Sequence, residues 1–103
     1  MPKYLYTYHG GSMPETAEEG EAVMAAWMSW FGQLGEAVVD GGNPTSMAKT
    51  VSADSVVDGG GANPATGYSL VNASDLDAAV EMAKGCPVLS SGGTVEVAEL
   101  MEM

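Results

Sequence analysis

Ser74-Asp-Leu-Asp-Ala-Ala-Val-Glu-Met-Ala-Lys-Gly85, followed by Thr94-Val-Glu-Val97, is the stretch that decides the fold. It predicts a helix capped by Ser74 and ended by Gly85, and then a closing strand over residues 94–101. The same order, a strand and then a helix, opens the chain. The sequence therefore predicts two strand–helix halves joined into one unit.

The first half begins with a strand over Lys3–His9. A helix is expected from Thr16, with Glu19 as its capping-box partner, to a stop at Gly35. Apolar residues on one face of this helix recur with a period of 3.6 residues; they are Val23, Trp27, Trp30, Phe31 and Leu34.

The middle of the chain predicts a strand over residues 36–40, a long connection over residues 44–66 and a strand over residues 67–73. Within the connection, Lys49–Val51 and Val56–Asp58 suggest a small hairpin. The complete order predicts an α+β, ferredoxin-like βαββαβ fold with a four-stranded antiparallel sheet in the order 4-1-3-2. We expect residues 1–103 to form a single domain, with residues 44–66 as an insertion.

Such a sheet carries helices on one face only. Along the first strand, Tyr4, Tyr6 and Tyr8 alternate with Leu5, Thr7 and His9, so both faces of the strand lack charge after Lys3. An uncovered apolar face favours burial against a second copy. We therefore expect a homodimer whose two sheets pack face to face.

Composition limits the classes of partner. Fourteen acidic residues stand against three lysines and no arginine, for a formal net charge of −11. This charge argues against nucleic acid and anionic membranes as partners. No apolar run approaches the length of a membrane span, and the lone Cys86 permits no internal disulfide, so a cytoplasmic protein is expected. No phosphate-binding or metal-ligand motif is present, and neither a metal nor another cofactor is expected.

The topology suggests one place for chemistry. His9 and Asp40 end strands that run in the same direction on either side of a third strand, which carries Tyr68 near its start. Their backbones are expected about 10 Å apart. One hypothesis makes His9 an acid or base oriented by Asp40. The alternative is that His9 bonds a loop carbonyl and that Asp40 is a turn residue.

A cleft at the same edge would be walled by Trp27, Asn43 and the hairpin that carries Lys49 and Asp58, with Tyr68 inside it. Trp27 can equally belong to the core, Asn43 to a turn, and Lys49 to the solvated surface. We treat these residues as candidate ligand-binding residues.

The chain resembles the YCII-related family, and within it the DGPF-type branch. The resemblance covers nearly the whole chain and rests on Lys3-Tyr-Leu-Tyr6, Met24-Ala-Ala-Trp-Met-Ser-Trp-Phe31, Val38-Val-Asp-Gly41, Val57-Asp-Gly-Gly60, Gly67-Tyr-Ser-Leu70 and Ser74-Asp-Leu-Asp-Ala-Ala79. It implies a dimeric α/β barrel of ferredoxin-like halves.

The resemblance also implies two departures from the family pattern. Met24 stands where some members carry a helix histidine that faces an aspartate. Gly60 and Gly61 replace the proline and phenylalanine of the Asp-Gly-Pro-Phe signature, of which Asp58 and Gly59 remain. Both departures argue against catalysis.

Three functions stay open. A binding domain for a small molecule or protein partner predicts an apolar pocket lined by Trp27 or Tyr68. An enzyme predicts His9 in a cavity and within about 3.2 Å of a carboxylate. A scaffold, in which the dimer itself is the working unit, predicts no pocket beyond packing voids.

Overall fold

The computed structural model describes residues 1–102; Met103 lies outside the described residues. Within residues 1–102, two α-helices, six strands and two 3₁₀ turns follow one another. They are β1 (Lys3–His9), α1 (Ala17–Leu34), η1 (Gly35–Ala37), β2 (Val38–Asp40), β3 (Lys49–Val51), β4 (Val56–Asp58), β5 (Ala65–Asn72), α2 (Leu76–Ala83), η2 (Pro87–Ser91) and β6 (Thr94–Glu99).

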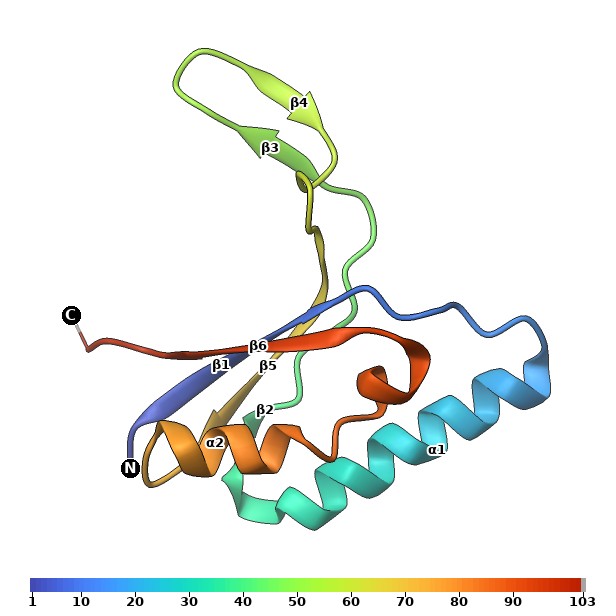
Figure 1. The fold of residues 1–103 in the computed structure, drawn as a ribbon, viewed down its shortest axis with the longest axis vertical. Coiled ribbons are helices and arrows are strands. Elements are labelled where there is room, and N and C mark those ends of the chain that lie inside the picture. Colours follow the sequence, from blue (N-terminus) through green and yellow to red (C-terminus); the bar gives the residue numbers. More distant parts are fainter. Residues whose placement is uncertain (103) are drawn as a thin grey trace.

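The main sheet has four strands in the order β2-β5-β1-β6, and each strand is antiparallel to its neighbours. Strand β6 lies at one edge and β2 at the other (Figure 1). If β1, β2, β5 and β6 are counted as strands 1 to 4 of the fold and the sheet is followed from β6, this is the predicted order 4-1-3-2. The α+β, ferredoxin-like fold is therefore confirmed. Strands β3 and β4 form a separate two-stranded hairpin at the predicted residues.

Both helices lie on the same side of the sheet (Figure 1). Beneath them, Tyr4, Tyr6 and Tyr8 of β1 are buried, together with Trp30 of α1. The Tyr6 hydroxyl donates to the carbonyl oxygen of Ala79 at 2.5 Å, and the Trp30 indole N–H donates to the carbonyl oxygen of Met82 at 3.0 Å. The polar atoms of these large side chains are thereby satisfied inside the core, which fixes α2 over β1.

Helix α1 begins as its sequence predicts. The Thr16 hydroxyl accepts from the Glu19 N–H at 3.1 Å, and the Glu19 carboxylate accepts from the Glu15 N–H at 2.9 Å. The helix ends at Gly35, whose φ of 57° suits glycine better than any other residue.

The start of helix α2 differs from the prediction. Asp75, and not Ser74, is the cap, because its carboxylate accepts from the Ala78 N–H at 2.8 Å while its own backbone stays extended. A carboxylate at this position also interacts favourably with the helix dipole. The helix therefore begins at Leu76, one residue later than it would if Ser74 were the cap.

Strand boundaries differ as well. Strand β2 begins at Val38 and not at residue 36, because Gly35–Ala37 continue α1 as a 3₁₀ turn. Strand β5 begins two residues earlier than expected, at Ala65, where it pairs with His9. Strand β6 ends at Glu99, two residues before the predicted end.

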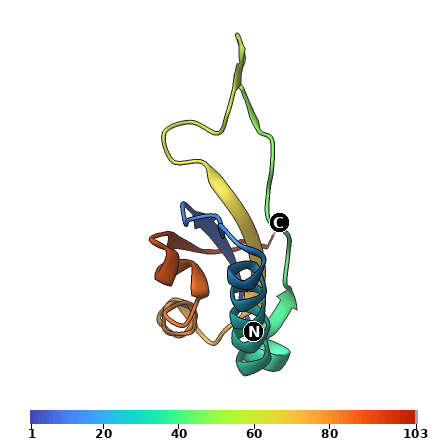
Figure 2. The ribbon, with the colours of Figure 1, turned by 90° about the vertical axis from the view of Figure 1, so that its right-hand side faces the viewer.

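The other face of the sheet has no covering element among the described residues. Leu5 lies opposite Leu70, and Thr7 lies opposite Tyr68, on strands β1 and β5. Leu5 and Leu70 are only half-buried, and Tyr68 is 36% exposed. We call this surface the open face. The hairpin β3–β4 stands clear of the sheet and the helices (Figure 2).

Candidate functional site

A cavity of about 760 Å³ lies between helix α1 and the segment that follows strand β2. One wall comes from α1, including Gly20, Met24 and Trp27, and the other comes from residues 41–44 and 66–68. Its size is within the range of small-molecule sites, and its lining is mainly apolar. We call it the aromatic cavity.

Aromatic rings give the cavity its character. Tyr8 and Trp27 pack edge to face with ring centroids 5.0 Å apart, and Trp27 lies 5.8 Å from Phe31. All three line the cavity. Trp27 was a predicted ligand-binding residue. Tyr8 and Phe31 were not predicted to bind a ligand. Phe31 follows Trp27 by four residues on the predicted helix, so the sequence does indicate that the two rings are neighbours.

Hydrogen bonds hold the wall opposite α1. The Tyr8 hydroxyl donates to Oγ of Ser69 at 2.7 Å, and the Ser69 hydroxyl donates to the carbonyl oxygen of Gly41 at 2.7 Å. The Tyr68 N–H donates to the carbonyl oxygen of Asn43 at 3.4 Å. The chain beyond β2 thus runs closely along β5, so that Asn43, a predicted ligand-binding residue, lines the cavity.

Glycine makes this close approach feasible. Gly42 has a φ of 72°, and a Cβ built there would lie 1.8 Å from the carbonyl oxygen of Tyr68. No side chain fits in that space, so a residue other than glycine would push the segment away from β5 and alter the cavity wall.

Burial raises the pKa of Tyr8, and its hydrogen bond to Ser69 opposes that rise. Nearby Cys86 and Tyr6 reinforce the effect of burial. The phenol therefore stays protonated at neutral pH and serves as a fixed donor to Ser69 rather than as an acid for a ligand.

His9 does not line the aromatic cavity. It ends strand β1 and is buried, with Nδ1 3.2 Å from the carbonyl oxygen of Pro64 and Nε2 3.0 Å from Oε1 of Glu96. Glu96 is one diagonal step away across β6, since its own partner is Thr7. Both partners of the imidazole are acceptors, so both contacts are hydrogen bonds only when both ring nitrogens carry a proton.

The expected contact between His9 and Asp40 is not formed. Asp40 lies opposite Leu70, which lies opposite Leu5, so Asp40 is four residues down the sheet from His9, or about 13 Å. The 3₁₀ turn delays the start of β2, and the short strand stops before it reaches the level of His9. Oδ1 of Asp40 instead accepts from the Gly42 N–H at 2.8 Å, a turn contact.

The hairpin does not wall the cavity, contrary to the expected cleft. Lys49 and Asp58 lie on β3 and β4, where Lys49 Nζ is 2.6 Å from Oδ1 of Asp58. Both side chains are mostly exposed, and neither lines the aromatic cavity. The hairpin instead projects away from the sheet and the helices (Figure 2).

Tyr68 borders the cavity from strand β5. Its partner across β1 is Thr7, and neighbouring Gly67 and Ser69 are buried while Tyr68 is not. The alternation of a strand thus places the Tyr68 side chain on the open face. Met24, where the resemblance implies a histidine in some proteins, lines the cavity and is 66% exposed.

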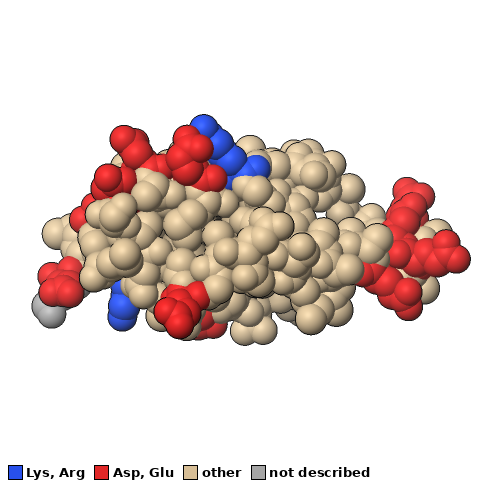
Figure 3. Space-filling view, turned by 90° about the horizontal axis from the view of Figure 1, so that it is seen from below, with Lys and Arg blue, Asp and Glu red and all other residues tan. Residues whose placement is uncertain are grey.

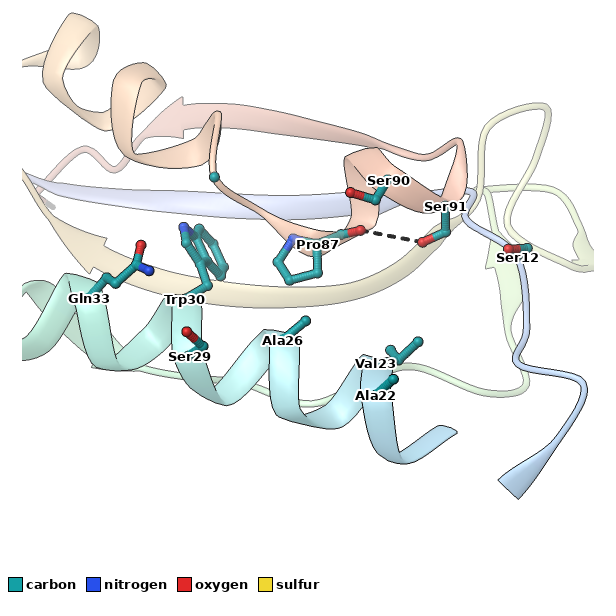
Figure 4. Close-up of a pocket in the computed structure, with 11 residues that line it drawn as sticks. Ser12, Ala22, Val23, Ala26, Ser29, Trp30, Gln33, Pro87, Ser90 and Ser91 are labelled. Carbon is teal, nitrogen blue, oxygen red and sulfur yellow. Dashed lines mark hydrogen bonds between the residues drawn. The ribbon is translucent and has the colours of Figure 1, made fainter. Parts of the chain in front are cut away.

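A second hollow, of about 500 Å³, runs between α1 and η2. It is lined by small and uncharged side chains, among them Ala22, Ala26, Ser29 and Ser90 (Figure 4). Ser91 donates weakly to the carbonyl oxygen of Pro87 at 3.4 Å. Trp30 borders this groove but is almost entirely buried, which leaves no aromatic face for a ligand.

Among residues 1–102 no group of three or more His, Cys, Asp or Glu side chains is placed to hold a metal ion. No helix in that part of the chain has the length and apolar character needed to cross a bilayer.

The fold and the cavity define a small ferredoxin-like α+β domain with an aromatic-lined pocket. No protein-family profile matches the sequence, and no curated protein matches it significantly. Among solved structures, 5-chloro-2-hydroxyhydroquinone dehydrochlorinase (TftG) from Burkholderia phenoliruptrix AC1100 is similar, with a TM-score of 0.56 over 96% of this chain and 95% of that one. Sequence identity is 16%, so the likeness concerns the fold. TftG was solved in complex with 2,5-dihydroxybenzoquinone.

Proposed function

We propose that this protein binds a small organic molecule with a flat ring in the aromatic cavity. The observation that carries the proposal is the cavity itself, about 760 Å³ in volume and walled by Tyr8, Trp27 and Phe31. Ligand sites are typically concave and apolar, with a few polar groups that orient the ligand. Asn43 and Glu21, which also line the cavity, are the polar side chains suited to that role.

The similarity to TftG, a protein solved with a small quinone, supports the proposal at the level of the fold. We further propose that the chain is a distant member of the YCII-related family, of the DGPF type. The motifs shared with that family and the fold support this assignment. Met24, in place of the histidine implied by the resemblance, favours binding over catalysis.

The test is a thermal-shift screen of small aromatic compounds on the wild-type protein and on a variant whose cavity is filled. Gly20 lines the cavity, and a Cβ there would meet only the Pro14 side chain, at 3.9 Å. In Gly20→Leu, the new side chain occupies space that a ligand needs. We expect hits on the wild type and no ligand-induced shift in this variant.

Gly32→Leu is the matched control. Gly32 lies on the same helix, and a Cβ there would have no neighbour within 4 Å. The substitution brings the same gain in helix propensity without touching the cavity. Hits that survive in Gly20→Leu as fully as in Gly32→Leu would refute the cavity as the binding site.

A second candidate function is an enzyme that uses His9. The pair of His9 with Glu96 at 3.0 Å favours it, with Glu96 in the orienting role first assigned to Asp40. Against it, His9 lies outside the cavity and both of its ring nitrogens already face acceptors. His9→Ala and Asp40→Ala, tested in the same thermal-shift screen, distinguish the two functions. Only the enzyme hypothesis requires the ligand-induced thermal shift to change in His9→Ala.

We also propose that the working unit is a homodimer joined through the open face. Leu5, Leu70 and Tyr68 are apolar side chains that a single chain leaves partly exposed there. Burying them against a second copy would stabilise the pair by about 25 cal/mol per Å². Light scattering is expected to report twice the mass of the 10.5 kDa chain.

Leu70→Lys tests the interface, because it places a charge on the open face and leaves the helix side untouched. Val80→Lys is the control, since Val80 is 38% exposed on helix α2. We expect monomers from the first variant and dimers from the second. A wild-type protein that is monomeric at micromolar concentration would rule the proposal out.

A further inference from the structure

The aromatic cavity is asymmetric in charge. Among its lining residues, Glu21 alone carries a formal charge at neutral pH. No lysine lines it: Lys49 pairs with Asp58 on the hairpin, Lys84 pairs with Glu81 beside α2, and Lys3 begins strand β1. A ligand in the cavity thus meets one carboxylate and no cation.

This asymmetry disfavours anions. A carboxylate or phenolate that enters an apolar, aromatic-lined space loses water and gains no cationic partner there. Repulsion from Glu21 and from the net charge of −11 acts in the same direction.

A cation meets favourable groups instead. Trp27 and Phe31 are only half-buried and their ring centroids are 5.8 Å apart, so one ligand can contact both rings. The face of an aromatic ring attracts ammonium groups, most strongly in tryptophan. Glu21 is three residues before Met24 and therefore its neighbour on the surface of α1, and both line the cavity together with Trp27.

The carboxylate of Glu21 has no hydrogen-bond or ion-pair partner among residues 1–102, whereas Glu19 on the same helix caps the Glu15 N–H. Acidic side chains gather at both ends of one face of the molecule, including the end where α1 begins, while much of the surface between them carries no charge (Figure 3). The field at this end draws cations toward the cavity.

We propose that the aromatic cavity selects protonated amines that carry an aromatic ring, and that Glu21 is the residue that sets this preference. The inference rests on the proposed function, since it names the ligand class of the same cavity.

Three probes that share one ring system test it on the full chain: 2-naphthylmethylamine, 2-naphthylmethanol and 2-naphthoate, each titrated by calorimetry. We expect the amine to bind about fivefold more tightly than the alcohol, and the naphthoate to bind more weakly than both. In Glu21→Gln the advantage of the amine over the alcohol should vanish. Glu18→Gln, which removes a charge from the first turn of α1 outside the cavity, should retain it.

Two results overturn the inference and leave the proposed function standing. One is naphthoate binding as tightly as the amine. The other is a preference for the amine that persists in Glu21→Gln or is lost equally in Glu18→Gln. A different result, in which none of the three probes binds and the aromatic screen yields no hits, refutes the proposed function itself.

Discussion

The hydroxyl of Tyr8 lies 2.7 Å from Oγ of Ser69, and the two form a buried hydrogen bond between strands β1 and β5. Because the Ser69 hydroxyl in turn donates a hydrogen bond to the carbonyl oxygen of Gly41, one chain of hydrogen bonds links strand β1 through β5 to the wall of the aromatic cavity. These two hydrogen bonds therefore hold the shape of the aromatic cavity.

Ser69→Ala should lower the free energy of unfolding by about 1–3 kcal/mol, because it leaves the buried Tyr8 hydroxyl without an acceptor. Adding Tyr8→Phe removes that unpaired group, so the double variant should be more stable than Ser69→Ala alone. Urea unfolding followed by circular dichroism measures both effects. Ser29→Ala, at an exposed position of α1, is the control; additive losses in the double variant would contradict the prediction.

Gly42→Ala should destabilise the protein by about 3 kcal/mol, because the new methyl group overlaps the backbone of Tyr68 and the positive φ adds strain. Gly41→Ala is the matched control, since its Cβ would touch only the Phe31 ring, at 3.9 Å. We expect that variant to lose less than about 1 kcal/mol. Equal unfolding midpoints for the two variants would contradict the prediction, because they would show that residues 41–44 can move away from β5 without loss of stability.

Local signals in the sequence were sufficient for the fold. The period of 3.6 in α1, the Thr16 cap and the Gly35 stop each depend on near neighbours in the chain, and the structure agrees with them. Errors arose where two neighbouring residues compete for one role, as Ser74 and Asp75 do for the cap of α2. The order of strands followed from the order of elements, because few topologies suit so short a chain.

The site was less predictable. Trp27 and Asn43 were expected to line a cleft, and both line the aromatic cavity. The pairing of His9 with Asp40 failed because it depends on register, and a single 3₁₀ turn before β2 moves Asp40 along the sheet. Glu96 comes from the opposite edge strand, and no local pattern links it to His9.

Alkaline pH should destabilise the fold. Burial raises the pKa of Tyr6 to about 12, assisted by nearby Cys86, from an ordinary value of 10.0. A group whose pKa is higher in the folded state binds its proton more tightly there, so its stabilising contribution is complete below pH 10 and is lost as the pH rises toward 12. Urea unfolding at pH 8 and pH 11 should show this loss, with tyrosinate absorbance at 295 nm as an independent count of ionisation.

Buried Cys86, whose pKa is raised by burial to about 11, also loses its proton toward pH 11, so a variant is needed to isolate the tyrosine. Tyr6→Phe removes the titrating hydroxyl, along with its bond to Ala79. It should be less stable than wild type at pH 8 but lose less stability between pH 8 and pH 11. A loss in Tyr6→Phe as steep as in the wild type would contradict the role of Tyr6.

Cys86 should resist thiol reagents while the chain is folded. It is 2% exposed, and burial raises the pKa of its thiol to about 11, although a backbone hydrogen bond at Val88 opposes the rise. At pH 8 the folded protein thus offers little thiolate and little access, and Ellman's reagent should react rapidly only in urea. If the reaction requires global unfolding, Ser69→Ala should accelerate it by the factor that its lost stability predicts, since both report the same unfolded population. Reaction of the native wild type as fast as in urea would contradict the burial of Cys86.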